Sequence, residues 1–178
     1  MGSMQIRKEE VADREAVFRV VERAFENEVH SDHREQFLVE RLRHSAAFVP
    51  ELALVAELDG SVVGYILLTK IRIVNEQGNS TPSLALAPVA VLPAHQGKGI
   101  GGQLIAYAHR RAAALGFGSV VVLGHGNYYP RFGYRPAREY NISLPFEVPD
   151  ENCMAIELAV GALNNARGMV EYAAEFGG

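Results

Sequence analysis

The sequence predicts an α/β domain whose sheet carries helices on both faces. Stretches with helical spacing alternate with runs that are rich in β-branched residues. Those runs are apolar with only weak alternation, which indicates strands covered on both sides. At 178 residues with 48% hydrophobic residues, the chain is long enough for one domain with a substantial core.

Composition narrows the possible function classes. A net charge of −4 and a pI near 5.9 argue against a nucleic-acid partner. No apolar run approaches the length of a membrane span and no signal peptide opens the chain, so we expect a cytoplasmic protein without membrane contact. The single cysteine, Cys153, permits no internal disulfide, and the spacing of the histidines supports no metal site.

The expected domain organisation depends on how residues 1–3 and residues 160–178 are interpreted. Residues 1–3 precede a second methionine and look like a cloning remnant. We expect residues 4–178 to form a single domain, with residues 160–178 as a C-terminal extension of it. No linker, repeat or low-complexity tract indicates a second domain.

The first part of the chain predicts a short strand and two helices. Alternation over Met4–Arg7 indicates a first strand. Asp13 is a candidate N-cap for a helix that runs to Phe25, because apolar residues then recur at helical spacing. A polar loop follows over residues 26–32, and a weaker helix is expected over residues 33–44.

The next part predicts a hairpin. Two β-rich runs, Ala53–Leu58 and Ser61–Leu68, flank the dipeptide Asp59-Gly60, which is a strong local signal for a two-residue hairpin turn. A strand is also expected over residues 71–74, with a turn over residues 75–79.

The central strand is expected over Leu84–Leu92, and it contains Pro88. Proline has no N–H for a strand ladder, so a bulge or an unpaired stretch is expected there. A glycine-rich loop follows at residues 96–102 and leads into a helix that Gly116 ends. Unobstructed amides together with a helix N-terminus make this loop a candidate anion site, most often used for phosphate.

The C-terminal part predicts short strands. A buried strand is expected at Ser119–Leu123, and further strands are expected near Arg138–Ser143 and Cys153–Ala159. The tail around residues 168–172 is a candidate edge strand.

Two phosphate-binding motifs compete for the glycine loop. Gly97, Gly99 and Gly102 spell the dinucleotide fingerprint G-x-G-x-x-G. That motif needs an acidic residue after the next strand to hold the ribose, whereas here Leu123 is followed by Gly124 and His125. A nucleotide-dependent oxidoreductase is therefore disfavoured.

The other motif is Gln96-x-x-Gly99-x-Gly101, preceded by Val89-Ala90-Val91-x-Pro93. At these residues the chain closely resembles the GNAT family of acetyl-CoA-dependent N-acetyltransferases. Within that family it resembles the bacterial proteins that are predicted N-acetyltransferases. The resemblance implies a mixed six- or seven-stranded sheet with a splayed centre, acetyl-CoA as co-substrate, and no metal. The residues that it implies for coenzyme binding are Val89, Ala90, Val91, Gln96, Gly97, Lys98, Gly99, Ile100, Gly101 and Gly102.

The resemblance also implies a catalytic residue. Tyr129 with Gly133 and Tyr134 matches the family pattern Y-x-x-x-G-[FY]. The resemblance implies a short helix within residues 127–134 and makes Tyr129 the expected general acid for the leaving thiolate. The position seven residues earlier, where many members carry asparagine, is Val122. The sequence does not identify a general base, because neither the central strand nor the strand at Ser119–Leu123 contains a carboxylate. Water, a group on a loop and His125 are the remaining candidates for this role.

The expected reaction is direct transfer of acetyl to a primary amine of an unidentified small molecule or protein. In this family the loop between the first two helices helps to form the acceptor pocket, so Glu28, His30 and Asp32 are acceptor-side candidates. Family habit and the apolar tail favour a homodimer. The alternative function is an acyl-CoA-binding sensor or regulatory module without turnover.

Overall fold

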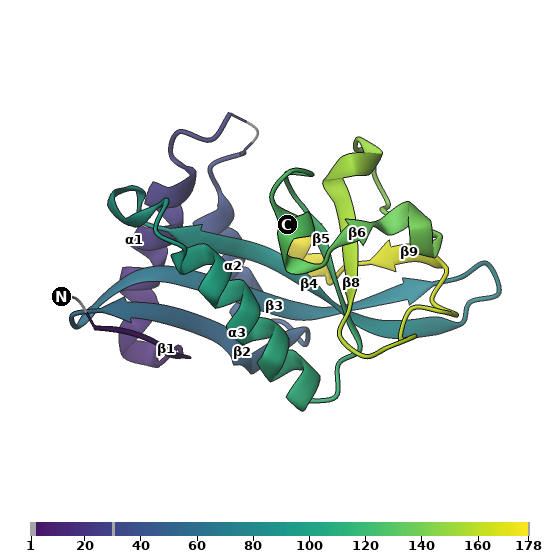
Figure 1. Cartoon of the computed structure of the whole chain (residues 1–178), viewed down its shortest axis with the longest axis horizontal. Coiled ribbons are helices and arrows are strands. Elements are labelled where there is room, and N and C mark those ends of the chain that lie inside the picture. Colours follow the sequence, from purple (N-terminus) through teal and green to yellow (C-terminus); the bar gives the residue numbers. More distant parts are fainter. Residues whose placement is uncertain (1–2, 30, 178) are drawn as a thin grey trace.

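A computed structural model describes residues 3–29 and 31–177, and within them a single mixed sheet organises the molecule (Figure 1). Seven strands follow the order β1-β2-β3-β4-β5-β8-β6, and two short strands, β7 and β9, join beside them. The seven-stranded order and the helices on both faces confirm the predicted fold class.

The first four strands form an antiparallel meander, in which consecutive strands are neighbours. Their bounds are β1 Met4–Lys8, β2 Phe48–Leu58, β3 Ser61–Val74 and β4 Ser80–Val91. At the predicted hairpin, Asp59 and Gly60 both have positive φ, of 50° and 85°, as a type I′ turn requires. The strand expected at residues 71–74 is the far end of β3.

Helices α1 (Arg14–Phe25) and α2 (Glu35–Arg43) pack on one face of the meander, and α3 (Ile100–Ala114) packs on the other (Figure 1). Successive side chains of a strand point to opposite faces of the sheet, so each strand contributes apolar residues to the core on both faces. Val55 of β2 is buried with α1 and α2, whereas its neighbour Leu54 is buried with α3. The prediction of a sheet covered on both faces is therefore confirmed.

The end of α3 follows the predicted glycine stop. Gly116 has a φ of 92°, its N–H donates to Ala113, and the Phe117 N–H donates to Ala112, each at 3.0 Å. These two bonds form a Schellman motif, which satisfies carbonyls that the helix leaves without partners.

The C-terminal half consists of shorter pieces. Strand β5 (Ser119–Leu123) runs parallel to β4, and β8 (Cys153–Glu157) pairs with it on the other side. The remaining strands are β6 Arg135–Pro136, β7 Ile142–Ser143 and β9 Gly168–Glu171. Strand β9 pairs with the far end of β3, so the predicted tail strand is present. Single 3₁₀ turns, η1 to η6, lie at Val11–Asp13, Pro93–His95, Tyr129–Phe132, Ala137–Tyr140, Asp150–Asn152 and Ala174–Gly177.

Three predicted elements differ from the structure. The strand expected at Arg138–Ser143 is mostly the 3₁₀ turn η4, because Asn141 adopts a left-handed conformation (φ 60°) that interrupts any extended run. Helix α2 starts at Glu35, two residues later than expected, because His33 also has a φ of 60°. The expected short helix around Tyr129 is one 3₁₀ turn, η3.

The predicted capping role of Asp13 is also wrong. Asp13 precedes α1, but its carboxylate makes no cap hydrogen bond to that helix. It accepts instead from the guanidinium of Arg7 at 2.7 and 2.9 Å and from the Glu10 N–H at 2.7 Å. The bidentate bond to Arg7 lowers the pKa of Asp13 and ties β1 to the start of α1.

Within the described residues, no helix combines the length and the apolar character that crossing a bilayer requires.

Candidate active site

The centre of the sheet opens between β4 and β5. The two strands pair only at Leu84 with Val120 and at Ala85 with Val121. Past that point, the register between β3 and β4 shifts by one residue opposite Pro88, which is the predicted bulge. Residues 89–91 of β4 keep their pairing with β3 but have no pairing with β5. We call this opening the central gap; it leaves one edge of β4 free to pair with an extended ligand.

The glycine loop, residues 96–102, lies where β4 turns into α3 (Figure 1). Gly97 and Gly99 have φ values of 78° and 82°, and a Cβ on either would meet nothing within 4 Å. Both residues are exposed, and Gly99 is the residue immediately before α3. Their amides therefore lie open beside the positive end of the helix dipole, which is a suitable environment for a diphosphate.

Gly101 and Gly102 have a different role, which the motif did not reveal. A Cβ on Gly102 would lie 3.1 Å from the ring of Phe132, and one on Gly101 would lie 3.2 Å from the Tyr128 hydroxyl. These two glycines let the 3₁₀ turn η3 pack tightly against the first turn of α3. They position η3, whereas Gly97 and Gly99 shape the loop.

The other predicted coenzyme residues also separate by contact. The Gln96 amide donates to the Val91 carbonyl at 2.9 Å, so this side chain closes the loop back onto the end of β4. Lys98 is exposed and offers its charge to solvent, whereas Ile100 is buried in the core with α3. Val89–Val91 lie along the central gap, with Ala90 buried between two half-buried valines.

Tyr129 begins η3 and its side chain is 7% exposed. Its ring lies against Gly124, where a Cβ would come within 2.4 Å of Cε2, and meets the Tyr134 ring edge-on at 5.5 Å between centroids. Burial, with a smaller contribution from Tyr128, raises the pKa of Tyr129, so its hydroxyl stays protonated at neutral pH.

Tyr134 is held in turn by α3, a contact that the sequence did not reveal. Its hydroxyl lies 2.8 Å from Nε2 of His109, and the tyrosine is 2% exposed. Burial lowers the pKa of His109 to about 4. The imidazole is therefore neutral at neutral pH. Twenty-five residues separate the partners, so no local pattern marks the pair.

One predicted acceptor-side residue, Glu28, lies near His125, which the sequence left open as a candidate base. Glu28 Oε1 in the loop after α1 lies 3.8 Å from Nε2 of His125 in the loop after β5. Asp32 is exposed and accepts the Arg34 N–H at 2.9 Å, away from that pair. His30 lies outside the described residues.

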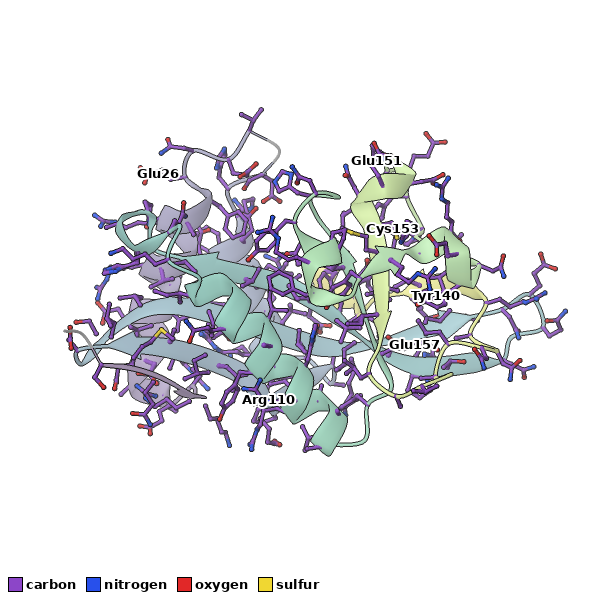
Figure 2. All side chains as sticks on the ribbon, viewed as in Figure 1. Glu26, Arg110, Tyr140, Glu151, Cys153 and Glu157 are labelled. Atoms are coloured by element: carbon purple, nitrogen blue, oxygen red, sulfur yellow. The ribbon has the colours of Figure 1, made fainter. Side chains whose placement is uncertain are left out.

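A hollow of about 590 Å³ lies between α1, the start of α2 and the segment that leaves β4. Its wall includes the carboxylates of Glu22 and Glu26, and Figure 2 labels Glu26 near the end of α1. Gln36 is 5% exposed, and its Oε1 has no hydrogen-bond partner in the described structure; the same holds for Nδ1 of His95. The remaining lining residues are Arg23, His33, Leu92, Pro93 and Ala94.

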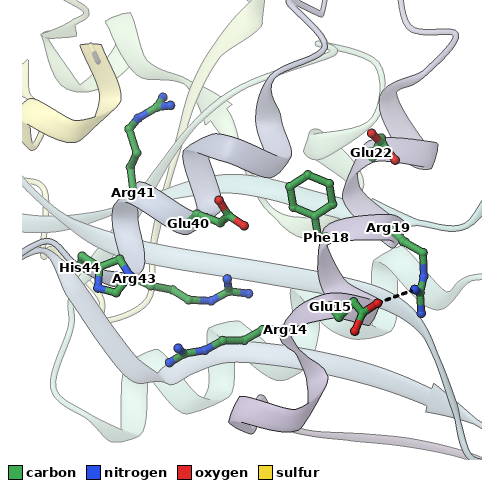
Figure 3. A pocket seen from close by; sticks show the side chains of 9 residues that line it. All are labelled: Arg14, Glu15, Phe18, Arg19, Glu22, Glu40, Arg41, Arg43 and His44. Atoms are coloured by element: carbon green, nitrogen blue, oxygen red, sulfur yellow. Dashed lines mark hydrogen bonds and ion pairs between the residues drawn. The ribbon is translucent and has the colours of Figure 1, made fainter.

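A second hollow, of about 690 Å³, separates the outer faces of α1 and α2 (Figure 3). Its charges are largely engaged within the protein. Arg19 pairs with Glu15 at 3.2 Å, and Arg43 pairs with Glu9, both side chains being 5% exposed. The Tyr65 hydroxyl also donates to Glu9 at 3.2 Å, so this buried cluster fastens α2 to β3.

Cys153 lies nearer to the gap than its place in the sequence suggests. It opens β8, opposite Leu123 at the end of β5, and Figure 2 shows it among the C-terminal strands. Burial raises the pKa of its thiol to about 11, and Asp150 adds to the shift. A thiol that stays protonated at neutral pH is a poor nucleophile. Among the described side chains, no group of three or more His, Cys, Asp or Glu is placed to hold a metal ion.

The model of the acetyltransferase (GNAT) family matches residues 15–134, which is more than half of the chain. The chain belongs to this family. The matched region runs from α1 through the glycine loop to Tyr134, and so it contains the central gap and η3.

Two Escherichia coli relatives are named N-acetyltransferases. YhbS is 30% identical over 174 residues, which cover 97% of this chain and 98% of YhbS. YjhQ is 37% identical over 120 residues, which cover 67% of this chain and 66% of YjhQ.

Two solved GNAT structures resemble this fold over nearly its full length. The structure of Escherichia coli YhbS in complex with CoA has a TM-score of 0.87 at 29% identity, covering 98% of this chain and 92% of that one. A GNAT acetyltransferase from Brucella melitensis in complex with acetyl-CoA has a TM-score of 0.80 at 33% identity, covering 98% of each chain.

Proposed function

We propose that this GNAT protein transfers acetyl from acetyl-CoA directly to a primary amine. The observation that carries the proposal is the unpaired edge of β4 at residues 89–91, beside a glycine loop with open amides. A pantetheine arm is extended and amide-bearing, so it can pair with a free strand edge as a peptide does. The relatives solved with CoA and with acetyl-CoA support the same co-substrate here.

Most of the predicted residues then have a part in binding or catalysis. The amides of Gly97 and Gly99, with the N-terminus of α3, bind the diphosphate, and Lys98 adds a nearby cation. Gln96 holds the loop to Val91. Backbone N–H groups along residues 89–91 pair with the pantetheine and stabilise the oxyanion. Tyr129 donates a proton to the leaving sulfur.

Direct transfer is the route that the chain's groups favour. An acetyl-enzyme needs an activated nucleophile, and burial holds the Cys153 thiol in its protonated form. Holding amine and thioester together in the gap can contribute about 7–11 kcal/mol without any covalent intermediate. The binding-only alternative gains no support from relatives that are named N-acetyltransferases.

The acceptor belongs to a cationic class. Glu22 and Glu26 line the hollow beside the segment that leaves β4, and Glu28 lies on the following loop. Carboxylates attract ammonium groups and suit either a small polyamine-like molecule or a protein amine. A cytoplasmic location and a homodimer remain predictions; sedimentation showing only monomer at micromolar concentration would remove the second.

The test of the proposal compares two glycine variants. Gly99→Glu places a negative charge in the diphosphate site, whereas Gly60→Glu adds the same charge at the β2–β3 hairpin. Both glycines have positive φ (82° and 85°) and open surroundings, so backbone strain is matched.

We expect Gly99→Glu to lose acetyl-CoA affinity at least about tenfold, since like charges at a desolvated site repel. Gly60→Glu should bind as the wild type does. Calorimetric titration measures both, and a panel of amines with thiol-release detection then measures turnover. Unchanged affinity in a folded Gly99→Glu protein contradicts the assigned diphosphate site.

A further inference from the structure

The proposed reaction needs a group that removes a proton from the acceptor. An alkylammonium has a pKa of about 10, so at neutral pH it cannot attack a thioester until it is deprotonated. Strands β4 and β5 border the central gap, and neither contains Asp, Glu or His between Ser80 and Val91 or between Ser119 and Leu123. The two strands that border the gap therefore supply no base, and a group on a neighbouring loop is the first place to look.

The register of β4 and β5 indicates the level at which His125 lies along the gap. In the parallel register Ala85 is opposite Val121, and Leu123 is the last residue of β5. His125 follows two residues later, past the point where pairing with β4 ends. If the same register continued past the last pair, position 125 would lie opposite residue 89. This is the level of residues 89–91, the segment proposed to hold the thioester. The imidazole side chain is 65% exposed, so an acceptor can reach it.

A carboxylate from the opposite side faces the imidazole. Glu28 comes from the loop after α1, and its Oε1 lies 3.8 Å from Nε2 of His125. This distance is that of a charge contact, longer than a hydrogen bond, and such contacts commonly shorten when substrate binds. In the tautomer that carries its proton on Nε2, the N–H would point to the carboxylate and the Nδ1 lone pair would be left for a substrate proton.

The same loop carries the proposed acid. The His125 carbonyl accepts the N–H of Tyr128 at 3.1 Å and that of Tyr129 at 3.5 Å. The Tyr129 ring packs on Gly124, the residue immediately before His125. One turn of backbone therefore fixes His125 and Tyr129 relative to each other, beside the gap.

We propose that His125 is the general base of the transfer and that Glu28 is a positioning residue that orients its imidazole. This inference rests on the proposed acetyl transfer. His125 takes the first proton from the ammonium, and the free nitrogen forms a bond to the thioester carbonyl carbon. The C–S bond then breaks, and sulfur takes a proton from Tyr129.

The proton balance closes with no further reactant. The nitrogen goes from three protons in the ammonium to one in the amide, so it loses two. The first leaves through His125 to solvent, and the second is lost as the amide forms and restores the Tyr129 hydroxyl through water. The products are the acetylated amine, the CoA thiol and one released proton.

Chemical rescue tests His125 as a base. We expect His125→Ala to lower kcat by about 10²–10⁴-fold, the usual contribution of general base catalysis, while the Kd for acetyl-CoA stays unchanged. Added imidazole should restore turnover in proportion to its concentration, since a free base can fill the vacated place. Lost packing alone would not be restored. His44→Ala, at an exposed histidine after α2, is the matched control and should equal the wild type with or without imidazole.

Glu28→Gln tests the positioning role. It should lower kcat less than His125→Ala does, and adding it to His125→Ala should cause no further loss, because Glu28 acts through the imidazole. Full activity in His125→Ala, or a loss that imidazole does not restore, overturns the base assignment. A wild type that binds acetyl-CoA yet acetylates no amine overturns the proposed function instead, and the base assignment with it.

Discussion

Tyr128 and Tyr129 are adjacent in sequence, but their side chains contact different parts of the protein. Tyr129 is packed between Gly124 and Tyr134, at the end of β5. The Tyr128 hydroxyl instead lies over Gly101 at the start of α3, and the Arg131 guanidinium stacks on its ring at 4.7 Å. The two rings thus lie at different places, Tyr129 at the end of β5 and Tyr128 beside the first turn of α3.

Replacing each tyrosine with phenylalanine separates these positions kinetically. Tyr129→Phe should lower kcat by about 10²-fold, the low end of general acid catalysis, because a thiolate with a conjugate-acid pKa of about 8–9 leaves tolerably unprotonated. The KM for acetyl-CoA should stay near that of the wild type. Tyr128→Phe should affect that KM more than kcat. Steady-state kinetics with the best amine decide, and the opposite pattern would show that the motif register at η3 is wrong.

At the residue scale, the sequence predicted local backbone conformation better than contacts between residues that are far apart in the chain. The motif spacing predicted a tight glycine loop, and Gly97 and Gly99 both have positive φ there, since backbone conformation within a short loop is a local property. The approach of Glu28 to His125 was not predictable, because it depends on how two segments far apart in the sequence fold together. No pattern along the chain marks such meetings.

At the scale of elements, the packing of η3 on α3 determines where both tyrosines lie. The two elements meet at Gly102, where any side chain would press on Phe132. In the first turn of a helix, alanine or valine would otherwise be tolerated, and alanine is favoured over glycine by about 1 kcal/mol. Loss of function at this position would therefore report on packing and not on helix formation.

Gly102→Val should displace Phe132 and η3 and lower kcat by about tenfold or more, since displacements near 1 Å can cost about 10²-fold. Gln103→Val is the matched control, because it adds the same β-branched side chain at the next, exposed position of α3. The measurement is turnover together with a circular dichroism spectrum. Recovery in the double variant Gly102→Val with Phe132→Leu would identify the clash as the cause, and normal activity in Gly102→Val would contradict it.

Elements with local determinants were predictable. The Asp59-Gly60 turn and the Gly116 helix stop depend on residues that favour positive φ, and both appear as expected. The strand expected over residues 138–143 failed for the complementary reason. An extended run was expected there, but Asn141 adopts a left-handed conformation that no sequence pattern required.

At the scale of the whole molecule, strand β3 explains how the sheet can open at its centre without dividing the protein. β3 spans 14 residues, pairing with β2 along its first part and with β9 at Arg72–Val74. An ion pair between Arg72 and Glu171 lies in that last register. The β3–β4 ribbon therefore joins both halves while β4 and β5 diverge. Ninety-nine residues separate Arg72 from Glu171, so sequence periodicity could suggest the tail strand but not its partner.

The stability of the whole fold should fall in acid because of one buried histidine. Burial lowers the pKa of His109 to about 4 from an ordinary value of 6.5, as the ring sits against the Tyr134 hydroxyl. Below pH 6.5 the unfolded chain protonates this ring while the folded chain does not, so the unfolded state binds more protons. The contribution is fully present above about pH 6.5 and is lost as the pH falls through about 4.

We expect this loss to reach roughly 2 kcal/mol, since a tenfold change in proton affinity is worth about 1.4 kcal/mol and partial exposure screens the ring. His109→Gln keeps a group that can hydrogen-bond Tyr134 but cannot titrate, so its free energy of unfolding should decline less between about pH 7 and pH 4.5. Urea unfolding measures this difference. His44→Gln, at an exposed histidine, should decline as the wild type does. An equal decline in all three proteins would show that His109 is not the group responsible and that the carboxylates, among them the Asp13 partner of Arg7, carry the acid sensitivity.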